Sequence, residues 1–160
     1  MLRLLGIALC CLLPAGAMAC LSPQGETGPI PVAGAELLTP NRYLVAAGGE
    51  VELPCPDAPF EMPRGFSARV SAGPDAVFDL GGMEGRILAV RAFATCPLRL
   101  IVNTGLGVWI TGEPLAAGAP DSHAEELYLW GPGNGALRVW LGTEEGTGCP
   151  AEVELETYDQ

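Results

Sequence analysis

The chain has 160 residues, and its 19 acidic and 8 basic side chains give a formal net charge of −11 at pH 7. Arginine carries every positive charge, because the sequence contains no lysine. An excess of carboxylates repels phosphate backbones, so nucleic acid is excluded as an expected partner. The length fits one domain with a single hydrophobic core.

Residues 1–19 have the pattern of a signal peptide. Arg3 supplies the positive start, residues 4–13 form the apolar core, and Ala17-Met18-Ala19 is a small-x-small cleavage site. The apolar core is too short to span a bilayer, and no later stretch is long and apolar enough for a transmembrane segment. We therefore expect an exported mature protein, periplasmic or extracellular.

Cys20 directly follows the expected cleavage point and offers an alternative form of the mature protein. The four residues before it satisfy a permissive bacterial lipobox, in which the cysteine thiol is acylated. A typical lipobox has leucine three residues before the cysteine, where this chain has Ala17. Ordinary cleavage is therefore favoured, and Cys20 is a candidate for lipidation that would tether the protein to a membrane.

Four cysteines remain after removal of the leader: Cys20, Cys55, Cys96 and Cys149. In an oxidising compartment at least one pair is expected to form a disulfide, and the sequence leaves all three complete connectivities open. A metal site is disfavoured, because there is no CxxC motif and His123 is the only histidine.

Residues 20–34 are expected to be an extended N-terminal segment, since they are rich in glycine and proline and have no apolar period. Residues 35–160 are expected to form one β domain, with a proline-rich loop at 54–64 and a second loop at 113–121. Short apolar pieces, most of them alternating, lie between turn residues at roughly ten-residue spacing, which is typical of strands. These pieces are 36–38, 43–45, 50–53, 66–70, 76–80, 86–93, 98–103, 108–110, 124–130, 136–142 and 151–157.

The last two runs, 136–142 and 151–157, show the clearest two-residue period. Between them lies a turn that contains Gly146 and Gly148. The pattern predicts a β-hairpin with one buried face. With no convincing helix elsewhere, the whole sequence predicts a single all-β domain, an antiparallel β-sandwich of the jelly-roll type.

No catalytic residue is predicted. A serine hydrolase would need His123 as its base, and no GxSxG motif frames a serine. Pairs of acids such as Glu125-Glu126 and Glu144-Glu145 are too common here to indicate a glycosidase, and we expect them to be exposed. The alternative to a non-enzymatic protein is a small envelope enzyme or inhibitor with its site in the loop from Glu113 to Glu126.

The tryptophans are the candidates for a binding surface. If Leu137, Val139 and Leu141 face the core, then Arg138 and Trp140 point to the opposite side of their strand, and the same alternation places Trp109 and Trp130 away from their apolar neighbours. Exposed aromatic rings can stack on sugars or bind a peptide. Three residues are therefore ligand-face candidates, unless a loop or the N-terminal segment covers the rings as a second small core: Trp109, Arg138 and Trp140.

Calcium is the one cofactor that an acidic exported β domain brings into question. Asp75, Asp79 and Asp121 are the aspartates that turns could present, yet no DxDxDG run is present. We therefore expect no cofactor, with calcium as the alternative.

Several short motifs together resemble the bacterial pre-peptidase C-terminal domain, and most of all a group of small exported alphaproteobacterial proteins that contain it. The ending is the most specific part, because that group typically ends in Gly-x-Tyr-x-x-Trp-Val-Gly-Thr, a cysteine and a closing strand. The matching residues are Leu21-Ser22-Pro23, Ala47-Gly48-Gly49, Pro74-Asp75, Phe78-Asp79-Leu80, Gly107 to Trp109, Trp140-Leu141-Gly142-Thr143, and Cys149 through Leu155-Glu156-Thr157.

The resemblance implies a β-sandwich in which Cys55, Cys96 and Cys149 belong to the fold and Cys20 is an extra thiol. This chain departs from the family at Pro97 and at the residues after Trp109, where the family has acids, and these departures argue against a calcium site built from those acids. Such domains accompany exported enzymes as non-catalytic appendages for secretion, targeting or surface binding. We therefore expect a non-enzymatic exported module that binds an envelope component, a glycan or a partner protein, with its oligomeric state left open.

Overall fold

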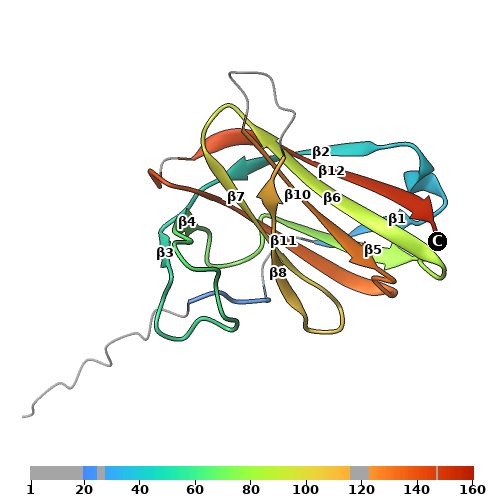
Figure 1. Ribbon diagram of the computed structural model, residues 1–160, viewed down its shortest axis with the longest axis horizontal. Coiled ribbons are helices and arrows are strands. Elements are labelled where there is room, and N and C mark those ends of the chain that lie inside the picture. Colours follow the sequence, from blue (N-terminus) through green and yellow to red (C-terminus); the bar gives the residue numbers. More distant parts are fainter. Residues whose placement is uncertain (1–19, 25–27, 116–122, 147) are drawn as a thin grey trace, which may run out of the picture.

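A computed structural model describes residues 20–24, 28–115, 123–146 and 148–160. In this part the chain forms two β-sheets packed face to face and one 3-10 turn, η1 (Glu36–Leu38) (Figure 1). The fold is a single all-β sandwich, as predicted. The predicted signal peptide, Asp121 and Ser122 lie outside the described residues. No helix among the described residues is long and apolar enough to cross a membrane.

The seven-stranded sheet is built on β11, which pairs with β5 along its first half and with β7 along its second half. All its pairings are antiparallel except that of β1 with β5, which is parallel. Its strands are β1 (Ile30–Ala33), β3 (Val51–Leu53), β4 (Ala68–Val70), β5 (Ala76–Gly81), β7 (Leu98–Asn103), β8 (Trp109–Thr111) and β11 (Gly135–Thr143). Residues 30–33 of the expected N-terminal segment thus form an edge strand of the sandwich.

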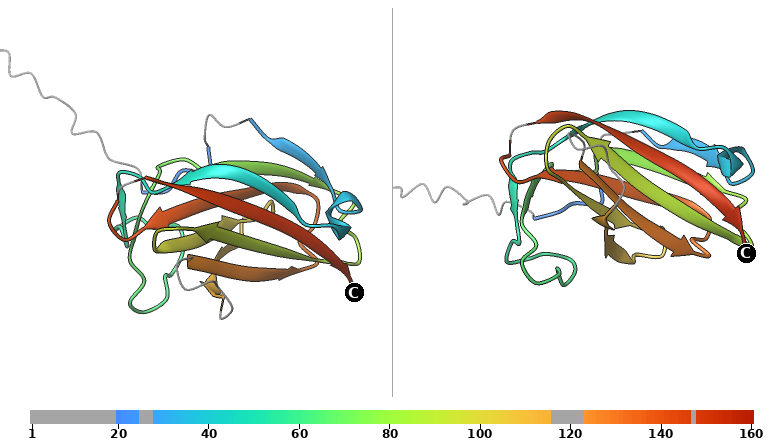
Figure 2. Two further views of the ribbon diagram at one scale, coloured as in Figure 1. Left: turned by 90° about the horizontal axis from the view of Figure 1, so that it is seen from above. Right: turned by 45° about the horizontal axis from the view of Figure 1, so that its top comes forward.

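The five-stranded sheet has the order β2-β12-β6-β10-β9 and is antiparallel throughout (Figure 2). Its strands are β2 (Asn41–Ala47), β6 (Arg86–Ala94), β9 (Glu113–Pro114), β10 (His123–Trp130) and β12 (Cys149–Asp159). Alternation decides which side of each strand is buried: in β6, Leu88, Val90 and Ala92 lie in the main core between the sheets, whereas Arg91 points outward.

The predicted hairpin of the last two strands is wrong. β11 pairs only within the seven-stranded sheet and β12 only within the five-stranded sheet, so the two strands lie on opposite sides of the core. Both have a buried inner row, for example Val139 and Leu141 in β11 and Val153 and Leu155 in β12. Alternation specifies that each strand has one buried face, but two strands in opposite sheets satisfy it as well as two neighbours do.

A second, smaller core covers the outer side of the seven-stranded sheet. It consists of Cys20 and Leu21 from the N-terminal segment, side chains of the segment 54–67 such as Phe60, and Trp140 from β11. The Cys20–Cys55 disulfide joins the two covering segments. Proline-rich backbone thus serves as a lid, with its apolar side chains turned toward the sheet.

A second disulfide, Cys96–Cys149, ties the β6–β7 connection to the start of β12. The two bridges together use all four cysteines of the expected mature chain. Cys20 is therefore part of the fold and not the extra thiol that the resemblance implied. Two disulfides indicate an oxidising, exported environment.

The strands β8 and β9 are one run of chain that changes sheets at Gly112. The Gly112 N–H still bonds to the Leu100 carbonyl of β7, after which the chain pairs with β10. The Leu100 N–H faces the same gap, and the carboxylate of Glu125 from β10 accepts its hydrogen bond at 2.7 Å. A side chain therefore replaces the ladder partner that the crossing strand no longer provides.

Gly112→Ala is expected to destabilise the sandwich by about 1–3 kcal/mol. A Cβ at this position would lie 2.9 Å from the Leu100 Cβ and 3.1 Å from the Glu125 Cβ, both held by packed strands. Gly81→Ala is the matched control, because a Cβ there meets nothing within 4 Å. Urea unfolding of both variants measures the difference, and equal stabilities would show that the crossing tolerates a side chain.

Candidate functional site

The outer side of the five-stranded sheet is the candidate binding surface, and we call it the open face. Several of its large apolar side chains are exposed: Leu44 is 84% and Trp130 75% accessible. The face is formed by alternate residues of four adjacent strands, in contrast to the covered outer side of the other sheet. These residues are Arg42, Leu44, Ile87, Arg91, Phe93, Glu126, Tyr128, Trp130, Pro150, Glu152, Glu154, Glu156 and Tyr158.

Arg91 is the centre of an ion-pair lattice in the middle of the open face. Its guanidinium donates to Glu126 at 3.4 Å, to Glu154 at 3.0 Å and to Glu156 at 2.6 Å, and to the Tyr158 hydroxyl at 2.8 Å. The register explains the arrangement, since Arg91 lies directly opposite Glu154 on one side and Glu126 on the other. Cross-strand neighbours of opposite charge stabilise a sheet in this way.

Arg42 extends the lattice onto β2 by bridging Glu152 at 3.3 Å and Glu154 at 2.8 Å. Four carboxylates (126, 152, 154 and 156) therefore meet two guanidinium groups (42 and 91), which gives the lattice a net charge of −2.

The lattice shifts the pKa values of Arg91 and Glu156 toward their charged forms. Partial burial lowers the pKa of Arg91, but its hydrogen bonds to Glu156, Tyr158, Tyr128 and Glu154 outweigh that effect and raise it. For Glu156 the net effect is a lowered pKa: burial raises it, but the hydrogen bonds from Tyr158 and Arg91 lower it by more. Arg91 and Glu156 are therefore held in their charged forms by their mutual contact.

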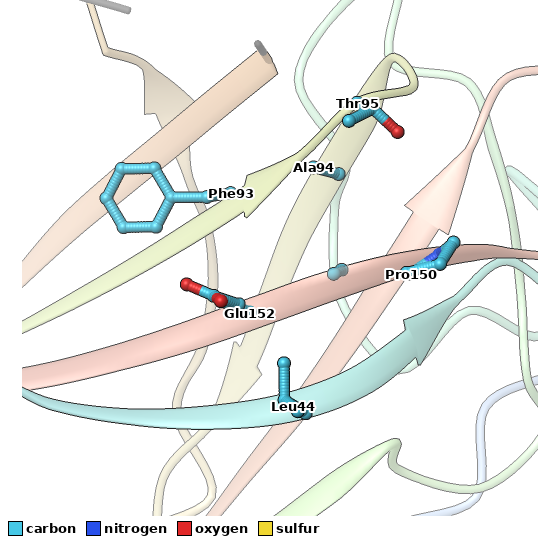
Figure 3. A pocket seen from close by; sticks show the side chains of 7 residues that line it. Leu44, Phe93, Ala94, Thr95, Pro150 and Glu152 are labelled. Atoms are coloured by element: carbon cyan, nitrogen blue, oxygen red, sulfur yellow. The ribbon is translucent and has the colours of Figure 1, made fainter.

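One end of the open face is apolar. Leu44, Phe93 and Pro150 line an open hollow of about 290 Å³ beside Glu152, and they come from three adjacent strands (Figure 3). The Arg42 guanidinium lies 5.4 Å from the centre of the Phe93 ring, so a cation–π contact joins this end to the lattice.

The opposite end of the open face is also apolar. Tyr158, Ile87 and Trp130 lie opposite one another in β12, β6 and β10, and Tyr128 lies two residues before Trp130. The face therefore has an order of apolar end, charged lattice and apolar end. Its outward-pointing Trp130 agrees with the alternation in the sequence.

The predicted ligand face on the other sheet is wrong for Trp140. Trp140 does point to the outer side of β11, but its exposed fraction is 0% because the second core covers it. Trp109 stacks on the Phe60 ring at 5.2 Å and lies at a tilt against the Trp140 ring at 5.0 Å. Arg138 is half-buried and donates to the Asn103 side chain at 3.3 Å. The apolar residues of segment 54–67 were the signal that this face is covered.

The enzyme alternative corresponds to a hollow of about 290 Å³ lined by His123, Glu125, Arg99 and Glu144, among others. Glu125, expected to be exposed, is buried, and both its oxygens are engaged: one accepts from Leu100 N–H and the other from Arg99 at 3.0 Å. Burial raises the pKa of Glu125, against the opposing effects of these two donors. The carboxylate holds the two sheets together. Asp121 lies outside the described residues.

The calcium alternative requires aspartates that share one site, and the structure gives Asp75 and Asp79 different surroundings. Asp75 accepts a hydrogen bond from the Leu141 N–H at 2.7 Å. Leu141 lies in β11 between the part that pairs with β5 and the part that pairs with β4. Asp79 points to solvent from β5. Among the residues that the structure describes, no three His, Cys, Asp or Glu side chains gather closely enough to hold a metal ion.

Asp75 is expected to make stability depend on pH. Burial raises its pKa from 3.8 to about 6, although the Leu141 N–H and the Ser71 side chain act in the opposite direction. The unfolded chain therefore loses this proton near pH 4 and the folded chain only near pH 6, so the contribution of Asp75 falls as the pH rises through that window. The loss is at most about 3 kcal/mol.

Asp75→Asn keeps an acceptor for Leu141 and cannot ionise. Urea unfolding between pH 4 and pH 7 should therefore show the wild type losing stability relative to this variant as the pH rises. A constant difference across the window would contradict the shifted pKa.

The lipidation candidate Cys20 is 6% exposed, and its sulfur is bonded to Cys55. A thiol engaged in a disulfide cannot be acylated, so this bridge and acylation of Cys20 exclude each other. The lipid-tethered form would lack this bridge and leave Cys55 unpaired.

Comparison with profiles of known protein families gives no match for the chain. Searches of curated proteins and of solved structures also find no match. The resemblance to the pre-peptidase C-terminal domain therefore stays a prediction from sequence motifs.

Proposed function

We propose that the chain is an exported, non-enzymatic β-sandwich module that binds a partner protein through the open face of its five-stranded sheet. The observation that carries the proposal is the order of that face, in which an ion-pair lattice lies between two exposed apolar ends. Aromatic side chains and arginine are the residues that contribute most to protein interfaces. Side chains already fixed by mutual contacts lose little entropy on binding.

The charge of the face favours a basic partner. The lattice has a net charge of −2 and the whole chain one of −11. An acidic surface attracts positively charged proteins over long range and disfavours acidic ones. The partner is therefore a protein with a basic surface and apolar side chains that contact the two ends.

The place of action follows from the sequence. The predicted signal peptide, cleaved after Ala19, directs the chain to the periplasm or the extracellular space, and the two disulfides fit such an oxidising compartment. The resemblance to pre-peptidase C-terminal domains suits the same role, since those domains are non-catalytic appendages of exported proteins.

Site-specific photocross-linking tests the proposal. A benzoylphenylalanine placed at Leu44, on the open face, is expected to cross-link a basic protein in the native envelope or secreted fraction. Leu38 is the matched control, because it is also an exposed leucine but lies in η1, away from the face. With the purified partner, Leu44→Ser and Trp130→Ser should each weaken binding at least about tenfold, and Leu38→Ser less than about twofold.

Two results would overturn the proposal. Equal cross-linking from positions 44 and 38 would place the contact elsewhere. A cross-linked adduct whose partner portion resists proteases and is shortened by glycosidases would identify a glycan as the partner.

A further inference from the structure

A groove runs between β8 and β10 beside the apolar end that contains Trp130. It has a volume of about 200 Å³ and is lined by the turn before β8, by β8 itself and by the end of β10. It exists because the β8–β9 run meets β10 only at Glu125 and Glu126. The part before Gly112, β8, belongs to the seven-stranded sheet and diverges from β10.

The end of β10 has a free edge in this groove. The Gly131 N–H bonds to the Arg86 carbonyl of β6, and the Ala124 carbonyl accepts from Leu115 on the opposite side. Backbone groups alternate in direction along an antiparallel strand, so those of Tyr128 and Trp130 point away from β6. In the described part of the chain no strand pairs with them. Edges of this kind are normally covered or blocked by charge, because they bind other strands.

Exposed apolar side chains concentrate at the same place. The described residues include seven large apolar side chains that are exposed, and four of them line this groove. These four are Leu106, Val108, Tyr128 and Trp130. Such a concentration on an acidic domain marks an interaction site.

Charge complementarity indicates the chemistry of the occupant. The groove lining itself is uncharged, but Glu126 accepts from the Tyr128 hydroxyl at 2.9 Å and so lies on its rim. Glu113 lies directly opposite Glu126 at the closed end and forms no ion pair with any described residue. A strand placed on this edge would turn alternate side chains into the apolar groove and the others toward these acids and the Trp130 ring.

We propose that an extended peptide segment of a partner protein, with alternating apolar and basic residues, pairs with the free edge of β10 and so adds a sixth strand to the five-stranded sheet. Its backbone pairs with the free groups of Tyr128 and Trp130. Its apolar side chains fill the groove, and its basic side chains face Glu113 and Glu126. This inference rests on the proposed function and specifies how the partner is held.

The experiment uses a fluorescent heptapeptide, Arg-Val-Arg-Val-Arg-Val-Arg, titrated into the mature protein at physiological salt. Anisotropy should report binding, and amide hydrogen exchange should slow at Tyr128 and Trp130 at least about tenfold. The same peptide with alternate N-methylated amides keeps its charge but cannot complete a ladder, so it should bind at least about tenfold more weakly. Trp130→Ser should weaken binding by a similar factor, and Leu44→Ser by less than about twofold.

Three results would overturn the inference. Equal affinity for the unmodified and the N-methylated peptide would show that charge attraction, and not strand pairing, holds the peptide. Loss of peptide binding in Leu44→Ser, with no protection at Tyr128, would place the peptide at the other end of the open face and leave the proposed function intact. Concentration-dependent dimerisation that protects Tyr128 and Trp130 would make a second copy of the chain the occupant.

Discussion

Replacing Trp140 by alanine is expected to lower the free energy of unfolding by about 3–5 kcal/mol, a large part of the stability of a domain of this size. Trp140 is fully buried and joins β11 to the lid over the seven-stranded sheet, where its ring lies 5.0 Å from that of Trp109. Alanine would leave a cavity that packed strands below and disulfide-linked segments above cannot close. Urea unfolding followed by circular dichroism measures the loss.

Trp130→Ala is the matched control, since it removes the same side chain from a position that is 75% exposed. It should change stability by no more than about 0.5 kcal/mol. Trp140→Phe refines the test, because the buried Nε1–H of Trp140 has no hydrogen-bond partner among the described residues. Phenylalanine should therefore recover most of the loss. Equal effects of the two alanine variants would show that the second core does not form.

Alternation predicted the strands of the sandwich well, and it predicted little about their partners. The runs at 86–93 and 136–142 became β6 and β11 with nearly the expected bounds, because each needs one apolar row for the core. The expected apolar piece at 36–38 is a 3-10 turn, η1. The pairing of β11 and β12 with different sheets depends on contacts distant in sequence, which a local period does not contain.

The candidate site was less predictable for a related reason. Alternation placed Trp130 and Trp140 on outer faces, and the structure agrees for both, but only one of the two faces is covered. Whether a face is open depends on the path of the N-terminal segment and of residues 54–67. The lattice around Arg91 required the register of three strands, and the free edge of β10 required the crossing at Gly112.

The buried acids show a further limit of the sequence. The sequence offers Asp75 as a candidate calcium ligand and predicts that Glu125 is exposed. Each instead accepts a hydrogen bond from a backbone N–H that has lost its ladder partner where a strand ends or changes sheets. Such breaks arise from the tertiary arrangement, so no local pattern marks the acids that fill them.

Removing the Cys20–Cys55 bridge, with both cysteines replaced by serine, is expected to cost about 4 kcal/mol of stability, as loop-closure entropy predicts for the 35 residues it spans. It should also change the near-ultraviolet circular dichroism of Trp109 and Trp140, because the bridge holds their cover in place. Replacing Cys96 and Cys149, which are 53 residues apart, is the control. It should cost a similar amount and leave the tryptophan signal unchanged, since that bridge packs against the main core.

The Cys20–Cys55 bridge also predicts the covalent state of the cysteines in the mature protein. Intact mass should show a chain that begins at Cys20, carries no acyl group, and is lighter than the reduced chain by four hydrogen atoms, two for each of the two disulfides. Alkylation without reduction should modify no cysteine. Acylation of Cys20 would instead leave Cys55 reactive and hold residues 54–67 over Trp140 by packing alone. A lipid-modified protein with one reactive thiol would therefore contradict both the disulfide and the fixed lid.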